Sequence, residues 1–203
     1  MDQHAPAVNK VVVIGASAGG ISALIHIFTH LPEGLPAAVL IVQHLRIGPE
    51  TQLPVILTHC NSLRQVCLAQ DGMPLEPNMG YIAIPGQHLH IENGRLVLGL
   101  EEPVNYVRPS IDVLFTSAAQ AFGHNVIGVV LSGTGRDGAN GCLAIKAKGG
   151  VTIAQDEKTS LHFAMPKAAI DTSAIDYVLP LSEIAGKIVA LTADRQDACK
   201  SCW

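Results

Sequence analysis

The amino-acid sequence predicts an α/β fold in which a doubly wound, mostly parallel sheet carries an attached antiparallel β-hairpin. Short apolar runs rich in Val, Ile and Ala alternate with segments whose apolar residues recur at helical spacing. Two of these runs end in glycine-rich turns that lead directly into a helical pattern. The hairpin is indicated by Asn93-Gly94, which stands between two strand-like runs.

The composition fits one domain built around a buried sheet. Of the 203 residues, 48% are hydrophobic and only 15% are charged, and the formal net charge is -4. A nearly balanced charge without a basic run gives no indication of nucleic-acid binding. The apolar stretches are too short for a membrane span and the first residues do not form a signal peptide, so we expect a cytoplasmic protein. We divide the chain into a leader at 1–9, one domain at 10–193 and a tail at 194–203.

In the first half of the chain, the predicted elements follow from apolar runs and from Pro and Gly. Four consecutive apolar residues at 11–14 predict a strand that is buried on both faces. Apolar residues at helical spacing predict a helix over 21–30, which Pro32 and Gly34 end. Gly48-Pro49-Glu50 begins a short helix that Pro54 interrupts. On the same grounds we predict strands at 38–42, 65–68 and 81–84, turns at 71–74 and 77–80, and hairpin strands at 89–92 and 95–98.

In the second half, capping signals mark the helices. Ser110 is the predicted N-cap of a helix that carries Asp112 in its first turn. Gly149-Gly150 ends a helix over 139–147, and Pro166 begins one that runs to residue 170. The predicted buried face of the helix after Ser110 consists of Val113, Leu114, Ala118, Ala119 and Phe122. Further strands are predicted at 125–131, 151–154 and 177–179, and a final amphipathic helix at 182–191.

The turn after the first strand carries a nucleophile motif. Gly15-Ala16-Ser17-Ala18-Gly19 matches G-x-S-x-G between a strand and a helix, where a sharp turn exposes the Ser hydroxyl and N–H groups can stabilise an oxyanion. One alternative is a dinucleotide-binding turn, but this requires Gly in place of Ser17 and an acidic residue after the second strand. That strand ends in Gln43-His44 instead. A second alternative is a structural Ser without chemistry.

Two further strand ends supply the partners that a nucleophilic Ser needs. His44 follows the second strand, and Asp137 lies in the glycine-rich turn after the strand at 125–131. Because parallel strands end at one edge, the three side chains can converge there, with His44 as base and Asp137 as the group that orients it. The order Ser, His, Asp differs from that of the α/β-hydrolases. As alternatives, His44 is an ordinary surface histidine and Asp137 only favours a helix N-terminus.

Other polar residues compete for these roles. His162 is the main rival base, and Asp112 and Asp156 are rival third members of the set. His88 and His90 face one side of the predicted hairpin, but two histidines without a Cys or carboxylate partner do not make a metal site. We therefore predict no metal site.

The cysteines indicate a reducing environment. There are five, an odd number, in a chain without an export signal. Cys199 and Cys202 form a lone C-x-x-C in the last five residues, away from the helix start where a redox motif belongs. We therefore regard this pair as a feature of the C-terminal tail and not as a redox motif of the domain.

Several motifs together point to one family. They are residues 14–20, Val42-Gln43-His44, Gly80-Tyr81-Ile82-Ala83 with Pro85, residues 108–115, residues 131–139 and Ala154-Gln155-Asp156-Glu157. In this order, over about residues 10–191, the sequence resembles the catalytic domain of the bacterial chemotaxis receptor protein-glutamate methylesterases. The position of Thr134 is usually Met in that family, and residues 45–48 also depart from its pattern.

The resemblance implies a function and a set of site residues. It implies hydrolysis of glutamyl methyl esters on methyl-accepting chemotaxis receptor helices, and deamidation of certain receptor glutamines, without a cofactor. Ser17 would be the nucleophile, His44 the base and Asp137 the third member, with the backbone N–H groups of Ala18 and Thr134 in the oxyanion hole. A non-catalytic receptor-binding or scaffold domain, and an esterase for a different small ester, stay open as alternatives.

The resemblance also bears on regulation. Members of the family often carry an N-terminal phospho-acceptor receiver domain, and this chain begins about ten residues before its first predicted strand. We therefore expect a chain without a receiver domain, controlled by expression, by receptor conformation or by a regulatory protein that binds in trans.

Overall fold

The main feature of the computed structural model, which describes residues 8–46, 48, 51–60, 63 and 65–193, is a large parallel sheet. Its seven described strands have the order β3-β4-β2-β1-β7-β8-β9, and every neighbouring pair is parallel. They are β1 (Val11–Ala16), β2 (Ala38–Gln43), β3 (Gln65–Leu68), β4 (Met79–Ile82), β7 (Val126–Val130), β8 (Val151–Gln155) and β9 (Tyr177–Leu179). The prediction of a parallel sheet is confirmed.

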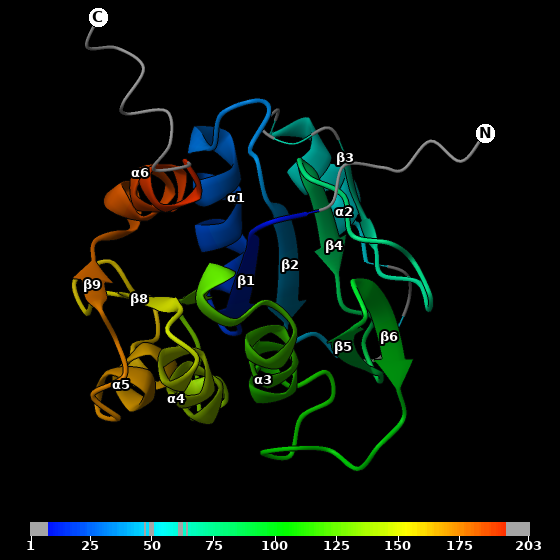
Figure 1. Cartoon of the computed structure of the whole chain (residues 1–203). Coiled ribbons are helices and arrows are strands. Elements are labelled where there is room, and N and C mark those ends of the chain that lie inside the picture. The colour runs from blue at the N-terminus through cyan, green and yellow to red at the C-terminus, as the bar shows by residue number, and fades with distance from the viewer. Residues whose placement is uncertain (1–7, 47, 49–50, 61–62, 64, 194–203) are drawn as a thin grey trace, which may run out of the picture.

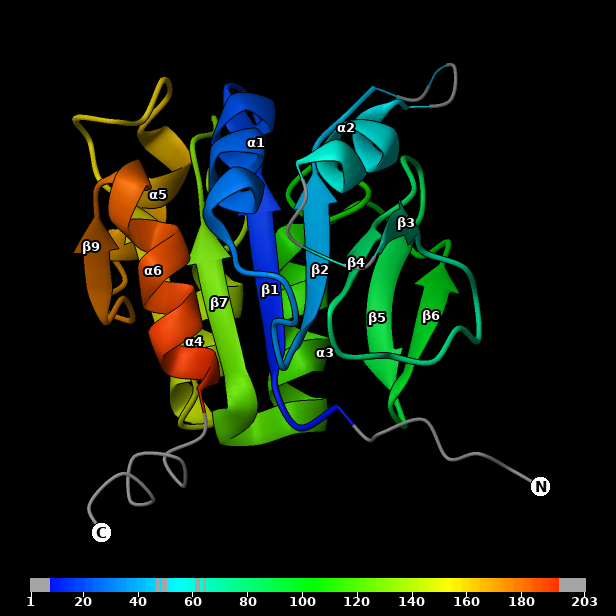
Figure 2. The ribbon, with the colours of Figure 1, turned by 90° about the horizontal axis from the view of Figure 1, so that it is seen from above.

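Helices cover both faces of this sheet (Figure 1). One face carries α1 (Gly20–His30), α2 (Leu53–His59) and α6 (Leu181–Thr192), which lie in front of the strands in Figure 2. The other face carries α3 (Ile111–Phe122), α4 (Ala139–Ala147) and α5 (Ala164–Ile170). A short 3-10 helix, η1 (Gly123–Asn125), connects α3 to β7. The doubly wound arrangement is thus also confirmed.

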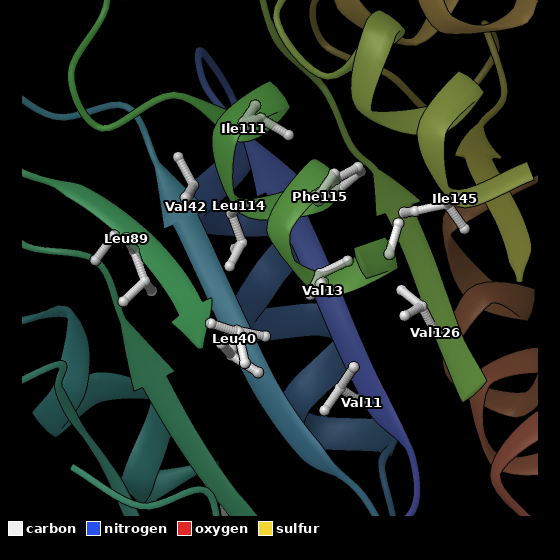
Figure 3. Close-up of a cluster of buried hydrophobic side chains, with 14 of the residues drawn as sticks. Val11, Val13, Leu40, Val42, Leu89, Ile111, Leu114, Phe115, Val126 and Ile145 are labelled. Carbon is white, nitrogen blue, oxygen red and sulfur yellow. The ribbon is translucent and has the colours of Figure 1, made fainter. Parts of the chain in front are cut away.

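The core consists of two apolar layers, one on each face of the sheet. Alternate residues of β1 face opposite layers: Val11 and Val13 pack with α3 and α4, whereas Val12, Ile14 and Ala16 pack with α1 and α6. Figure 3 shows the first layer, in which side chains of β1 and β2 meet those of α3 and α4. Because both faces are covered, β1 and β2 are apolar and buried nearly throughout.

The order of the strands reverses beside β1, where a crevice is expected. From β1 the chain builds β2, β3 and β4 on one side, and then returns to build β7, β8 and β9 on the other. Open parallel sheets bind ligands at such a reversal, outside the carboxyl ends of the strands. Ser17 directly follows β1, and Asp137 lies in the loop after β7, so the fold brings both to this crevice.

The predicted hairpin is present as a separate two-stranded sheet. Its strands, β5 (His88–Glu92) and β6 (Arg95–Gly99), are antiparallel and pair with each other. Asn93 and Gly94 both have positive φ, 50° and 72°, as the predicted two-residue turn requires. The hairpin packs on α3, where Ser117 Oγ accepts a hydrogen bond of 3.1 Å from the Ile91 N–H.

Several element predictions are wrong in detail, and one of them is the start of α5, which begins at Ala164 rather than at Pro166. Pro54 does not interrupt a helix but lies in the first turn of α2, where a missing N–H costs nothing; Pro49 and Glu50 lie outside the described residues. β4 begins at Met79, two residues before the predicted start. The face of α3 includes buried Ile111 and Phe115, whereas Val113 and Phe122 are only half-buried.

Some predictions fall outside the part of the chain that the structure describes. Most of the leader, and the whole tail with Cys199 and Cys202, lie outside the described residues. The division of the chain into a leader, a domain at 10–193 and a tail therefore stays a prediction. Among the described residues, no helix combines the length and apolar character needed to cross a bilayer.

Candidate active site

Ser17 lies in a sharp turn between β1 and α1 that is held by backbone hydrogen bonds. Its N–H donates to the Ser132 carbonyl at 3.0 Å, and its carbonyl accepts from the Gly20 N–H at 2.8 Å. Gly19 has a φ of 78°, a conformation that favours glycine. A Cβ on Gly133 would lie only 2.8 Å from the Cβ of Ser17, so the two glycine-rich turns approach as closely as they do only because residue 133 has no side chain.

His44 and Asp137 are joined by a hydrogen bond across the crevice. His44 Nε2 lies 2.9 Å from Asp137 Oδ2, and both side chains are largely buried. A carboxylate can only accept, so Nε2 carries the hydrogen and a neutral His44 ring has Nδ1 as its acceptor nitrogen. The backbone N–H of His44 donates to the Ala16 carbonyl at 3.0 Å, which fixes the end of β2 beside the turn that carries Ser17.

Asp137 is held by the first turn of α3. Besides His44, its carboxylate accepts hydrogen bonds from Ser110 Oγ at 2.7 Å, the Ile111 N–H at 2.6 Å, the Asp112 N–H at 3.1 Å and Asn105 Nδ2 at 3.1 Å. Burial alone would raise the pKa of Asp137, but the hydrogen bonds from His44, Ile111 and Ser110 outweigh it, and the pKa lies below its ordinary value. Asp137 is therefore a carboxylate at neutral pH.

Asp112 forms the mirror arrangement at the start of α4. Its Oδ1 accepts from the Gly138 N–H at 2.9 Å and the Gly141 N–H at 2.7 Å. Asp137, just before α4, thus accepts from N–H groups at the start of α3, and Asp112, in the first turn of α3, accepts from N–H groups at the start of α4. Burial, with the Asp137 charge nearby, raises the pKa of Asp112. Since Asp112 caps α4 and Asp137 contacts His44, the structure places Asp137 rather than Asp112 next to the predicted base.

A hollow of about 310 Å³ opens at this edge, and we call it the Ser17 hollow. It is lined by Ser17, His44, Asn105, Tyr106, Val107, Thr134, Gly135, Arg136 and Asp137. The predicted nucleophile, base and third member therefore share one surface. Among the hydrogen bonds of the described residues, none joins the Ser17 hydroxyl to His44, and none uses the N–H of Ala18 or Thr134.

The rival residues have other contacts. Asp156 Oδ1 accepts from the N–H and hydroxyl of Thr159 within its own loop. The side chain of His162 is exposed, and its backbone accepts from the Gly133 N–H and donates to Ser132 Oγ. His162 therefore braces the turn beside Ser17 through its backbone.

The two hairpin histidines differ in their contacts within the protein. His88 is buried: its Nδ1 accepts from the Ser110 N–H at 3.1 Å, and its Nε2 lies 3.2 Å from the Glu102 carbonyl. His90 Nε2 lies 3.4 Å from Glu101 Oε1 but makes no hydrogen bond among the described residues. Across the described ranges, no three His, Cys, Asp or Glu side chains are grouped so that they could hold a metal ion.

Several polar residues that support the site were missed in the sequence. Asn105 Nδ2 donates to both buried carboxylates, reaching Asp112 Oδ2 at 2.8 Å. Buried Gln43 donates through Nε2 to the carbonyls of Ser17 and His44. Gln155 Oε1 accepts from the Ser132 N–H at 2.9 Å. Gln43 and Gln155 are polar residues at the ends of buried strands, and this position in the sequence could have identified them as residues that support the site.

The close contact at Gly133 gives a first testable prediction. Gly133→Ala places a methyl group against Ser17 and Met165, and a displaced nucleophile is expected to lower the kcat of ester hydrolysis by about 100-fold. Gly186→Ala is the control, because a Cβ there meets nothing within 4 Å and Ala favours the α6 helix. Steady-state kinetics on an ester substrate measure the effect. Turnover of Gly133→Ala equal to that of Gly186→Ala would show that the spacing at Ser17 is not critical.

The chain is similar in sequence to a characterised enzyme family. Residues 12–188 match the CheB methylesterase family. A protein-glutamate methylesterase/protein-glutamine glutaminase of Pyrococcus horikoshii is 42% identical over 182 residues, which are 88% of this chain and 49% of that protein. A protein of the same name from Bordetella parapertussis is 42% identical over 197 residues, which are 92% of this chain and 54% of that protein. The chain thus spans about half the length of the curated relatives it matches.

The fold also matches a solved structure. The crystal structure of the Thermotoga maritima CheB methylesterase catalytic domain superposes with a TM-score of 0.86 at 36% sequence identity. The superposition covers 90% of this chain and 98% of that domain.

Proposed function

The chain belongs to the CheB methylesterase family, and we propose from this that it removes methyl esters from glutamate side chains of methyl-accepting chemotaxis receptors. The observation that carries the proposal is the hydrogen bond between His44 and Asp137 in the same hollow as Ser17. We extend the proposal to deamidation of receptor glutamines, because the relatives are named for both activities. We further propose that it acts in the cytoplasm, where a regulatory protein in trans controls it.

In the proposed reaction, Ser17 Oγ attacks the ester carbonyl and its proton passes to His44. Since Nε2 of His44 is bonded to Asp137, the accepting atom is Nδ1. The bond from the carbonyl carbon to the methoxy oxygen then breaks, and methanol leaves with the proton from His44. Water, deprotonated by the same nitrogen, hydrolyses the glutamyl-Ser17 ester and frees the glutamate carboxylate. With a glutamine substrate, ammonia leaves in place of methanol.

Two features lower the barrier in this proposal. The N–H groups of Ala18 and Thr134 face no acceptor among the described residues, and we assign them to the oxyanion of the tetrahedral intermediate. A backbone donor works whether the side chain at 134 is Thr or the Met usual in the family. The carboxylate of Asp137, with its depressed pKa, stays ionised and stabilises the imidazolium that forms at His44.

The experiment that tests the function uses a receptor cytoplasmic fragment carrying labelled methyl esters. The chain is expected to release labelled methanol from this fragment, and to do so faster than it hydrolyses a small ester at equal concentration. No release from the fragment, with no hydrolysis of small esters, would indicate a non-catalytic receptor-binding domain. Hydrolysis of small esters alone would indicate a different esterase.

The pH dependence gives a second testable prediction. The base must be neutral to accept the Ser17 proton, so the rate is expected to rise with pH as the base loses its proton. Asp137 does not contribute to this rise, because its pKa lies below the ordinary carboxylate value. Initial rates between about pH 5 and 8 measure the profile. A flat profile, or loss of activity on addition of a chelator, would point to different chemistry.

A further inference from the structure

A two-residue turn places an exposed tyrosine at the active edge. Val104 and Val107 exchange backbone hydrogen bonds of 3.2 and 3.0 Å, and Asn105 and Tyr106 form the turn between them. Both turn residues have positive φ, 52° and 65°. Such turns favour Asn and Gly at these positions, and a bulky residue there is strained. Tyr106 is nevertheless fully exposed, so folding gains no burial from its ring that would offset this strain.

The turn is held by hydrogen bonds to two carboxylates, those of Asp112 and Asp137. Asn105 Nδ2 donates to Asp112 Oδ2 at 2.8 Å and to Asp137 Oδ1 at 3.1 Å. The residue adjacent to Tyr106 is therefore bonded to the same carboxylate that holds His44. The position of the Tyr106 backbone is thus set relative to the reacting groups, although its side chain is surrounded by solvent.

Tyr106 lies between two hollows that meet at His44. One is the Ser17 hollow. The second, of about 300 Å³, we call the Pro103 hollow, and it is lined by His44, Leu45, Gly86, Pro103, Tyr106, Val107, Arg108 and Pro109. Tyr106 and Val107 line both. The Pro103 hollow contains mostly apolar side chains and no nucleophile, so its chemistry suits binding rather than reaction.

The positive charge of arginine side chains at the two hollows also indicates which kind of ligand binds there. The exposed Arg136 lines the Ser17 hollow and Arg108 lines the Pro103 hollow, although the chain as a whole carries a net charge of -4. A receptor segment that carries several glutamates is acidic wherever they are not methylated. Positive charge at this edge therefore favours an acidic polypeptide over a neutral small ester.

We propose that Tyr106 is a docking residue for the receptor helix. Resting on the proposed function, the proposal places the methylated glutamate in the Ser17 hollow and an apolar side chain one helical turn away in the Pro103 hollow. Side chains three or four residues apart lie on one helical face, so both can enter adjacent hollows together. The Tyr106 ring then packs against the helix between them. Its strained conformation is retained because it holds the ring in that place.

The test compares Tyr106→Gly with the wild-type chain on two substrates, a methylated receptor cytoplasmic fragment and p-nitrophenyl acetate. Loss of an aromatic docking residue is expected to raise KM for the fragment about tenfold, with kcat changed less than about twofold. The ratio of kcat/KM for the fragment to that for the small ester should fall by about the same factor. Tyr106→Phe keeps the ring and should keep the ratio. Leu143→Ala is the control, because Leu143 is an exposed apolar residue of α4 that lines neither hollow.

A stability measurement distinguishes docking from a structural role. Gly adopts positive φ without strain, so Tyr106→Gly is expected to raise Tm by about 2 °C while it weakens fragment binding. An unchanged ratio of the two kcat/KM values, or a Tm that falls by several degrees, would overturn the proposal. Failure of the proposed function would look different: the wild-type chain itself would not release methanol from the fragment.

Discussion

Ser17→Ala is expected to abolish release of methanol from methylated receptor, with a loss in kcat of roughly 10⁴-fold or more, as for other Ser-His-Asp enzymes. The reason is that the acyl-enzyme of the proposed reaction forms on the Ser17 hydroxyl, which the variant lacks. Thermal stability should hardly change, because the hydrogen bonds recorded for Ser17 use its backbone N–H and carbonyl rather than its hydroxyl. Labelled-methanol release and a thermal melt measure the two effects.

Ser182→Ala provides the matched control. Ser182 is an exposed residue near the start of α6, far in the sequence from the predicted site, and its loss should change neither turnover nor Tm. If Ser17→Ala kept more than a few per cent of wild-type turnover while Ser182→Ala behaved normally, the assignment of the nucleophile would be wrong.

Asp137→Asn is expected to lower kcat by about 10⁴-fold. The Asn side chain would face His44 Nε2 either with its NH₂ group, which cannot accept a hydrogen bond, or with its neutral carbonyl oxygen, which is a weaker acceptor than a carboxylate. In both cases the His44 tautomer that carries its hydrogen on Nε2 would be less favoured. In the wild-type chain the NH₂ group of Asn105 donates to Asp137 Oδ1, and the amide introduced at position 137 would accept this hydrogen bond less well than the carboxylate does. Steady-state kinetics on the receptor fragment measure the loss. A kcat within about tenfold of the wild-type value would contradict the role of Asp137.

The same variant should be less stable at neutral pH, in a way that depends on pH. The pKa of Asp137 is depressed in the folded chain, so its ionised form stabilises the fold above the unfolded pKa of about 3.9. That contribution is lost as the pH falls through the folded pKa. The Tm of Asp137→Asn is therefore expected to lie below the wild-type Tm at pH 7 and to approach it under acid conditions. Asp171→Asn, which removes only an exposed pair with Lys167, should show little difference at either pH.

The residues that carry the proposed chemistry were chosen in the sequence by their positions after predicted strands. Ser17 and His44 stand directly after buried strands and Asp137 lies in the loop after a third, and parallel strands bring such positions to one edge whatever their spacing in the chain. The hydrogen bond of His44 to Asp137 agrees with this reasoning. The roles of these residues in catalysis stay predictions until the variants are measured.

The supporting residues were not predictable in the same way. Ser110 was predicted as an N-cap, and it occupies that position, but no side-chain capping bond forms, and its hydroxyl donates to Asp137, 27 residues away. Asn105 lies in a loop whose conformation depends on two carboxylates from other segments. These contacts exist only once α3 and α4 have packed together, so no local pattern in the sequence indicates them.

The errors in the fold have a related origin. The buried face of α3 was predicted from one amphipathic stripe, but the helix packs against the sheet, α4 and the hairpin at once. Ile111 is buried because it fills the space left by Gly15 and Gly138, and a Cβ on Gly15 would lie 2.5 Å from it. Such complementarity between distant glycines and one large side chain is a property of the packed structure.

The central claim, that Ser17 is a nucleophile activated by His44 and Asp137, is tested most directly with a serine-reactive phosphonate. The purified chain is treated with the probe, digested and mapped by mass spectrometry. The account predicts one adduct per chain, on the peptide that contains Ser17, with much slower labelling of Asp137→Asn. No adduct, or an adduct on Ser110 or Ser132 in place of Ser17, would contradict it.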